Sequence, residues 1–304
     1  MSDERVTTRI FVVGTPRSGT TLVQGLLASH AAVTSFTESH FFSRHFRLGP
    51  RGAMTVLVAD PGPRVREFLS ENGVDERGAA RLTAEAGLDV PQRPLVRVLQ
   101  TRQVARQLLG VLDRLADRRN RLVWVEKTAR HLHYVPFLQR VSGRARPARF
   151  VHVIRDGLDV VASLYAASRQ WPSAPDPFAR GPSPPYDLET CVRRWNHDLA
   201  RSLARVGSEA DQFVFYEDLI RDPEATLAPV LRACGLAWDP AVLVRHADTA
   251  RELITPAEPW KRVAVDVEPS STVDRVLTGA QRTQAERSLR PGLYRSIRDS
   301  VRRA

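Results

Sequence analysis

The sequence predicts an α/β fold with a parallel β-sheet of four to five strands flanked by helices. Three observations support this: short continuous apolar runs, longer amphipathic segments between them, and a glycine-rich turn after the first run. Continuous apolar runs are typical of strands that are covered by helices on both faces. With 304 residues, 42% of them hydrophobic, the chain can bury a large core, which excludes a mainly disordered protein.

The predicted strands are the apolar runs rich in β-branched and aromatic residues. They cover residues 9–13, 122–125, 150–154 and 212–216, with 32–36 as a fifth candidate. Helical patterns fall between and after them, at residues 20–29, 95–115, 158–168, 190–206 and 223–234. Strands that alternate with helices in this way are typical of βαβ units in a parallel sheet.

Two regions interrupt the alternation, and we expect both to be insertions over one end of the sheet in a single domain spanning residues 1–304, where a functional site would lie. Residues 47–118 show helical patterns and turns but no convincing strand. Residues 171–185 contain six prolines, which exclude a helix and predict a lid loop. Residues 279–303 are expected to form one exposed amphipathic C-terminal helix.

The charge balance favours an anionic ligand. There are 45 lysines and arginines against 34 aspartates and glutamates, a formal net charge of +11. A nucleic-acid partner is not expected, because no zinc-finger, RNP or helix-turn-helix pattern accompanies the charge. No apolar stretch is long enough to span a membrane. For that reason we expect no membrane partner. The two cysteines imply no disulfide framework, so we expect a cytoplasmic protein.

A turn rich in glycine, serine and threonine follows the first predicted strand, in the sequence GTPRSGTT at residues 14–21. Such a turn directs backbone N–H groups and the positive end of a helix toward one anion. Gly14 and Gly19 have the spacing of the P-loop pattern G-x-x-x-x-G-K-[ST], so the predicted sheet is of the P-loop type. The predicted phosphate-binding residues are Pro16, Arg17, Ser18, Gly19, Thr20 and Thr21.

The lysine of the P-loop pattern is missing, since Thr20 occupies its position. Without that lysine a nucleoside triphosphatase would lose much of its transition-state stabilisation. A P-loop nucleotide kinase or hydrolase is therefore kept only as an alternative to the function that the following residues indicate.

A second strand–turn–helix unit lies at residues 150–165. Arg155 stands at the end of the strand and Ser163 follows eight residues later on the helix. Both are expected beyond the C-terminal edge of the sheet, where open α/β sheets bind their ligands. The two units together predict two anion sites at one edge.

These features resemble the sulfotransferases that use 3′-phosphoadenosine 5′-phosphosulfate (PAPS). In that family the first loop holds the 5′-phosphosulfate, and an arginine and a serine eight residues apart hold the 3′-phosphate. The resemblance is greatest to the branch that includes tyrosylprotein sulfotransferases and bacterial small-molecule enzymes. It also covers the segments Glu126-Lys127-Thr128, Trp195-Asn196 and Tyr216 to Leu219. Gly157 and Ala129 depart from it, because many relatives carry proline at these two positions.

The resemblance implies in-line transfer of a sulfuryl group from PAPS to a hydroxyl of a small-molecule acceptor, with 3′-phosphoadenosine 5′-phosphate (PAP) as the other product. It implies no metal, and the sequence shows no tight cluster of residues with metal-ligand spacing. An acceptor from specialised metabolism is expected, while its identity and the oligomeric state are left open. Tyr216 corresponds to a position that lines the adenosine pocket.

The catalytic candidates follow from the resemblance and from position in the sheet. Glu38 follows the candidate strand 32–36 and is the expected base, although Ser35 and Glu38 also have the spacing of a helix capping box. Lys127 follows the strand 122–125 and is expected, with Arg17, to stabilise the developing negative charge. Only two of the 45 basic residues are lysines, which favours a specific role for an ammonium group at Lys127. His131 is the alternative base.

Aromatic residues near these positions are the expected acceptor contacts. We expect Phe36, His40, Phe41, Trp171 and Tyr186 to contribute. Residues 260–262 and 270–271 correspond to a loop that relatives close over the co-substrate.

Overall fold

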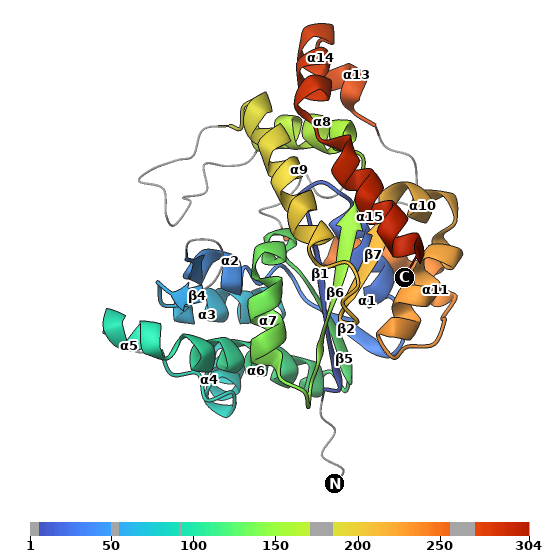
Figure 1. The fold of residues 1–304 in the computed structure, drawn as a ribbon. Coiled ribbons are helices and arrows are strands. Elements are labelled where there is room, and N and C mark those ends of the chain that lie inside the picture. The colour runs from blue at the N-terminus through green and yellow to red at the C-terminus, as the bar shows by residue number, and fades with distance from the viewer. Residues whose placement is uncertain (1–5, 50–54, 91–92, 171–184, 256–270, 304) are drawn as a thin grey trace.

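Five parallel strands form the central sheet of the computed structural model, which describes residues 6–49, 55–90, 93–170, 185–255 and 271–303. The strand order is β2-β5-β1-β6-β7 (Figure 1). The strands are β1 (Thr8–Gly14), β2 (Val33–Ser35), β5 (Val123–Lys127), β6 (Ala148–Ile154) and β7 (Asp211–Phe215). The predicted fold class is confirmed, and each predicted strand is present.

Helices cover both faces of the sheet, which explains the continuous apolar runs. Ile10 and Val12 of β1 pack into an apolar cluster with one set of helices: α1 (Thr20–Ala28), α11 (Pro223–Ala233) and α12 (Ala241–Glu252). Phe11 and Val13 face the opposite cluster, beneath α6 (Thr101–Arg118) and α7 (Val135–Ser142). Neighbouring residues of a strand point to opposite faces, so both must be apolar here.

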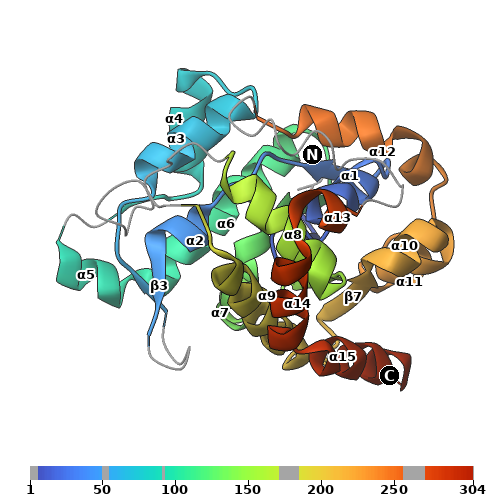
Figure 2. The ribbon, with the colours of Figure 1, turned by 90° about the horizontal axis from the view of Figure 1, so that it is seen from above.

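A third apolar cluster lies beyond the C-terminal ends of the strands, around α8 (Gly157–Ser168) and α9 (Leu188–Leu203). Figure 2, seen from above, shows α8 and α9 between the helices of the two faces. Three further helices complete this part of the chain: α13 (Val273–Val276), α14 (Gly279–Ser288) and α15 (Pro291–Arg303).

The prediction of one helix over residues 279–303 is wrong, because α14 and α15 are separate helices. Leu289 ends α14 in an extended conformation, and Pro291 begins α15. A proline disfavours helical geometry in the residue before it but fits the first turn of a helix.

The expectation of no strand in residues 47–118 is also wrong. A small antiparallel sheet forms from β3 (Phe46–Leu48) and β4 (Thr55–Leu57). Each strand has three residues, too few for a two-residue periodicity to be visible in the sequence. The helices of this region are α2 (Phe41–His45), α3 (Gly62–Glu71), α4 (Glu76–Glu85) and α5 (Pro94–Leu99), followed by α6.

The helix predicted over residues 95–115 is divided between α5 and α6. Thr101 begins α6, and its hydroxyl accepts a hydrogen bond from the backbone N–H of Leu57 in β4. This hydrogen bond holds the start of α6 against the small sheet, at the point where α5 and α6 are separated. The predicted lid at residues 171–185 lies outside the described residues, except for Pro185.

Across the described ranges, every helix is either too short or too polar to cross a membrane.

Candidate functional site

The predicted site residues lie at the carboxyl ends of neighbouring strands. β1 ends at the predicted phosphate-binding turn, β5 ends at Lys127, and β6 ends one residue before Arg155. Glu38 follows β2, and Tyr216 follows β7 as the first residue of α10 (Tyr216–Arg221). Because the strands are parallel, all these residues lie at one edge of the sheet.

The predicted phosphate-binding turn is held tightly against its neighbours. A Cβ atom on Gly14 would lie 2.6 Å from the carbonyl oxygen of Val153, and one on Gly19 would lie 2.6 Å from the ring of Tyr216. Gly19 also has a φ of 98°, and Arg17 has a φ of 75°. Both values lie in the left-handed region, which a glycine adopts readily but an arginine only rarely. The turn therefore has one specific shape.

The turn presents several donors to an anion. Among the residues that the structure describes, no side chain caps the N-terminus of α1, and the first turn of this helix contains no acidic residue. Within the part of the chain that the structure describes, the buried hydroxyls of Thr15 and Ser18 have no hydrogen-bond partner. Buried hydroxyls without a partner are costly, and a phosphate or sulfate group would satisfy them.

Two guanidinium groups, of half-buried Arg17 and buried Arg155, lie beside this turn. The Nε of Arg17 donates a hydrogen bond to the Oγ of Ser163 at 3.1 Å, so the two predicted anion sites are in contact. The guanidinium of Arg155 lies 4.1 Å above the centre of the Tyr216 ring. Burial, together with the positive charge of Arg155, lowers the pKa of Arg17. An anion bound here would reduce the repulsion between the two cations.

The backbone around Arg155 is fixed by residues whose role the sequence did not reveal. The indole N–H of Trp195 donates to the carbonyl oxygen of Arg155 at 3.1 Å. The carboxylate of Glu217 accepts a hydrogen bond from the N–H of Asp156 at 2.8 Å and another from the hydroxyl of Tyr294 at 2.7 Å. Trp195 and Glu217 lie in segments that resemble the sulfotransferases, and only this resemblance marked them in the sequence.

The glycine at position 157 has a packing reason. A Cβ atom there would lie 2.9 Å from the Trp195 ring and 2.9 Å from Leu289. The absence of a side chain allows the indole to reach the Arg155 carbonyl. Asp156 caps α8 instead, accepting hydrogen bonds from the N–H groups of Leu158 and Asp159.

The expected base and the expected cationic residue form an ion pair. The Nζ of Lys127 contacts one carboxylate oxygen of Glu38, and the Nε2 of His40 lies 3.4 Å from the other. The side chains of Lys127 and Glu38 are only 3% and 12% exposed. The alternative role of Glu38 in a capping box is wrong, because Ser35 belongs to strand β2 and the next helix begins only at Phe41, with His40 at its N-cap.

The backbone of Glu38 and Ser39 is held by a buried arginine in α3. Arg64 donates to the carbonyl oxygen of Glu38 at 2.6 Å and to that of Ser39 at 3.0 Å. Its guanidinium also forms ion pairs with Glu71 at 2.9 Å and with Glu67 at 2.8 Å. Sequence reasoning missed Arg64, which lies in the insertion and carries no motif.

Glu126 fixes the same segment from β5. Its carboxylate accepts hydrogen bonds from the N–H and hydroxyl of Ser39, at 3.1 and 2.8 Å, and from the hydroxyl of Thr128 at 2.6 Å. Burial acts to raise the pKa of Glu126, but His131 and the hydroxyl donors outweigh this and leave the pKa below its usual value. Glu126 is therefore a charged anchor for the strand end that carries Lys127.

His131 is buried and engaged on both sides of its ring. Its Nδ1 lies 3.0 Å from the Glu126 carboxylate, and its Nε2 accepts a hydrogen bond from the N–H of Phe42 at 3.3 Å. Because the Phe42 N–H must donate, the imidazole proton is assigned to Nδ1. An imidazole with no exposed surface and no open nitrogen is poorly placed to remove a proton from an acceptor.

The prediction that Phe36 and Phe41 contact the acceptor is wrong. Both are fully buried, and their rings pack against Phe68 at centroid distances of 6.0 and 5.0 Å. The Tyr186 ring lies 4.3 Å from the Arg194 guanidinium, and His40 remains beside Glu38. Trp171 and residues 260–262 and 270 lie outside the described residues.

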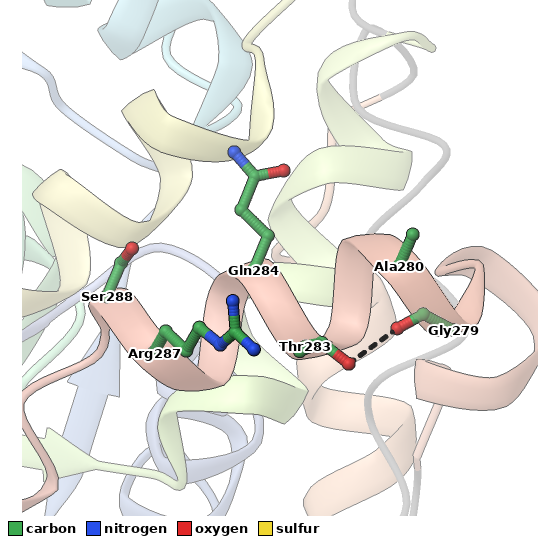
Figure 3. Close-up of a pocket in the computed structure, with 6 residues that line it drawn as sticks. All are labelled: Gly279, Ala280, Thr283, Gln284, Arg287 and Ser288. Carbon is green, nitrogen blue, oxygen red and sulfur yellow. Dashed lines mark hydrogen bonds between the residues drawn. The ribbon is translucent and has the colours of Figure 1, made fainter.

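A shallow hollow on the surface is separate from this site. Figure 3 shows the residues that line it, which all come from α14: Gly279, Ala280, Thr283, Gln284, Arg287 and Ser288. The hydroxyl of Thr283 donates to the carbonyl oxygen of Gly279, four residues earlier in the same helix. The hollow is one side of a helix and does not gather groups from several elements.

The parallel sheet, with two strand–turn–helix units that meet at one edge, defines a P-loop-type α/β protein. Residues 9–240 match the sulfotransferase family. The chain therefore belongs to this enzyme family, which sets aside the kinase or hydrolase alternative.

Two relatives illustrate the similarity in sequence. The chain is 23% identical over 240 residues to protein-tyrosine sulfotransferase from Drosophila melanogaster, covering 77% of this chain and 39% of that protein. It is 26% identical over 239 residues to protein-tyrosine sulfotransferase 1 from Danio rerio, covering 77% and 55%. The matched region thus spans little more than half of these curated relatives at most.

Two solved structures show the same fold. The sulfotransferase domain of the Synechococcus PCC 7002 olefin synthase aligns with a TM-score of 0.52 and 18% identity, covering 95% of this chain and 96% of that domain. The sulfotransferase domain from the curacin biosynthetic pathway aligns with a TM-score of 0.52 and 17% identity, covering 94% and 99%. Both similarities extend over nearly the whole chain.

Proposed function

We propose that this protein transfers the sulfuryl group of PAPS to a hydroxyl of a small-molecule acceptor. The observation that carries the proposal is the contact between the two anion sites. Arg17 of the first turn hydrogen-bonds Ser163 of the second, beside the buried Arg155. Two adjacent cationic sites of this kind suit a nucleotide with separate phosphate groups at its 5′ and 3′ positions.

The donors present fit the two ends of that nucleotide. Backbone N–H groups of the turn and the hydroxyls of Ser18 and Thr20 would hold the 5′-phosphosulfate. Arg155 and Ser163 would hold the 3′-phosphate, and the Tyr216 ring, which packs against Gly19 and Arg155, would border the adenosine. PAPS supplies the sulfuryl group.

Glu38 and Lys127 are placed for the two charge changes of this reaction. The Glu38 carboxylate would take the proton of the acceptor hydroxyl while the hydroxyl oxygen forms a bond to sulfur. The bond between sulfur and the bridging oxygen breaks, and the Lys127 ammonium would stabilise the negative charge that develops on that oxygen. In this proposal the residues of the chain would carry out both steps, and the proposed reaction uses no metal.

The acceptor is proposed to be small because Glu38 is nearly buried, with 12% of its side chain exposed. A hydroxyl on a slender molecule can reach such a carboxylate more easily than a side chain on a folded surface. We place this acceptor in specialised metabolism. The named activity of the matched relatives makes a tyrosine-containing peptide the second candidate.

Titration with PAP tests the nucleotide site directly. We expect PAP to bind and to raise the thermal unfolding temperature of the chain, because it binds only the folded state. Arg155→Ala should weaken PAP binding by about tenfold or more, since a hydrogen bond to a charged group contributes about 1.5–3 kcal/mol. Exposed Arg193→Ala is the matched control and should bind normally. An unchanged thermal transition at saturating PAP would refute the proposal.

Glu38→Gln separates catalysis from binding. It removes the base but keeps the size of the side chain, so turnover should fall about 10²–10⁴-fold while the Kd for PAP stays nearly the same. The measurement is sulfuryl transfer from PAPS to a panel of small alcohols, phenols and a tyrosine-containing peptide. Full activity of Glu38→Gln would return the role of base to His131.

A further inference from the structure

Three potential metal ligands meet between α9 and the 3₁₀ helix η2 (Ala129–Tyr134), outside the proposed nucleotide site. They are His133 of η2 and the adjacent His197 and Asp198 of α9. One ligand atom of each lies within 4.8 Å of the other two. The sequence did not reveal this cluster, because His133 is distant from the other two residues along the chain.

Two of the three spacings between ligand atoms are close to those of a tetrahedral metal site. The Nε2 of His133 lies 3.0 Å from the Oδ1 of Asp198, and the Nδ1 of His197 lies 3.7 Å from the same oxygen. In a tetrahedral zinc site with bonds of about 2.0–2.1 Å, two ligand atoms are about 3.3 Å apart. The two observed distances bracket that value, so small side-chain rotations would suffice.

The charge and burial of the cluster also suit a dication. Asp198 is almost completely buried, with 6% of its side chain exposed, whereas His133 and His197 are 22% and 53% exposed. The two imidazole rings stack at a centroid distance of 5.2 Å and an angle of 19°. A buried carboxylate is stable only with cationic or hydrogen-bonding partners, and a dication held between Asp198 and the two imidazoles would be such a partner.

We propose that His133, His197 and Asp198 bind one Zn²⁺ ion per chain, with water as the fourth ligand. Two imidazole nitrogens and a carboxylate form a donor set that binds zinc in preference to magnesium or calcium. The access to solvent through His197 provides an entry path for the ion. This site is independent of the proposed sulfuryl-transfer chemistry.

The position of the cluster gives the metal a structural role. η2 follows the strand end that carries Lys127, and His197 lies two residues after Trp195, whose indole holds the Arg155 carbonyl. A metal ion that joins η2 to α9 would therefore connect the segment carrying the catalytic lysine to the helix that positions the 3′-phosphate site.

Calorimetry with Zn²⁺ tests the proposal on the full chain after removal of metals with a chelator. We expect one Zn²⁺ per chain, and four-coordinate absorption bands when Co²⁺ is used instead. His197→Ala should weaken binding by at least about tenfold, and Asp198→Asn by a similar factor. His197 is half exposed, so its replacement should leave the fold intact, as circular dichroism and PAP binding can verify.

Two control variants distinguish this site from general metal binding at the surface. Arg193→Ala changes an exposed side chain of α9 one turn before His197, and His246→Gln removes a histidine in α12. Both should retain stoichiometric binding and the increase in Tm caused by Zn²⁺, which His197→Ala should lose. Absence of Zn²⁺ binding, or unchanged binding by His197→Ala, would overturn the proposal. PAP binding is measured in a separate titration. A chain that does not bind PAP would contradict the proposed function but not the zinc site.

Discussion

Lys127 illustrates how the composition of a chain can point to one residue. The chain uses arginine for 43 of its 45 basic residues, yet keeps lysine at the end of a buried strand. In the structure this lysine is 3% exposed and contacts Glu38. A compact ammonium fits such a narrow space, whereas a guanidinium is larger and planar.

Lys127→Arg should therefore impair catalysis although it conserves the charge. The larger group would displace Glu38, and a displacement of about 1 Å can reduce the rate about 10²-fold. The measurement is kcat with saturating PAPS, with PAP affinity as the control for the nucleotide site. Arg114→Lys, on the exposed side of α6, is the matched control and should leave kcat unchanged. Wild-type kcat in Lys127→Arg would contradict the requirement for an ammonium.

Single residues could be predicted from the sequence where they directly follow a strand. Lys127 and Arg155 lie at the sheet edge because parallel strands carry their ends to one side. Arg64 and Glu126 could not be assigned a role, since their partners, Glu38 and Ser39, are distant in the sequence. The phenylalanines near Glu38 were misassigned because an aromatic residue looks the same in a sequence whether it lies in a core or a pocket.

At the scale of elements, strand β1 and helix α6 are joined by a buried ionic cluster. The carboxylate of Asp113 accepts hydrogen bonds from Arg9 at 3.0 and 2.5 Å, from the Trp124 indole at 2.9 Å and from Arg146 at 2.8 Å. Arg9 stands near the start of β1, so this cluster lies at the opposite edge of the sheet from the proposed nucleotide site.

Asp113→Ala should therefore reduce stability without changing nucleotide affinity. Removing the carboxylate leaves Arg9 buried without its partner, which costs about 3–5 kcal/mol. Urea unfolding measures the loss, and PAP titration under native conditions should give the wild-type Kd. The double variant Arg9→Met/Asp113→Leu should recover part of the stability, because Arg9 is no longer a buried charge without a carboxylate, and Arg146, which is 31% exposed, can turn toward solvent. A weaker PAP affinity in the single variant would indicate that the two edges are coupled.

Elements with a long, regular pattern were predicted well, and short or interrupted ones were not. The strands of the main sheet and helices such as α1 and α8 follow the predicted ranges closely. The small sheet of β3 and β4, and the divisions between α5 and α6 and between α14 and α15, depend on contacts or on one proline. Such local features change hydrophobic periodicity too little to be visible in it.

At the scale of the whole molecule, the stability of the fold depends on a histidine with buried ring nitrogens, His45. This residue lies between β2 and β5, in the segment that also carries Glu38. His45, at the end of α2, accepts no hydrogen bond on its ring within the described residues, and both its nitrogens are buried. Burial, with the neighbouring Arg44, lowers the pKa of His45 from 6.5 to about 4. The folded protein therefore keeps this imidazole neutral.

This pKa shift predicts that the protein loses stability in mild acid. As the pH falls below 6.5, the unfolded chain binds a proton at His45 while the folded chain does not, so the free energy of unfolding decreases until the pH reaches about 4. Between pH 7 and 5 the decrease due to His45 is about 2 kcal/mol. Buried His152, whose pKa is also lowered by burial, acts in the same direction. Urea unfolding at the two pH values should show a smaller decrease in His45→Gln, and an equal decrease in both proteins would mean that His45 titrates normally in the fold.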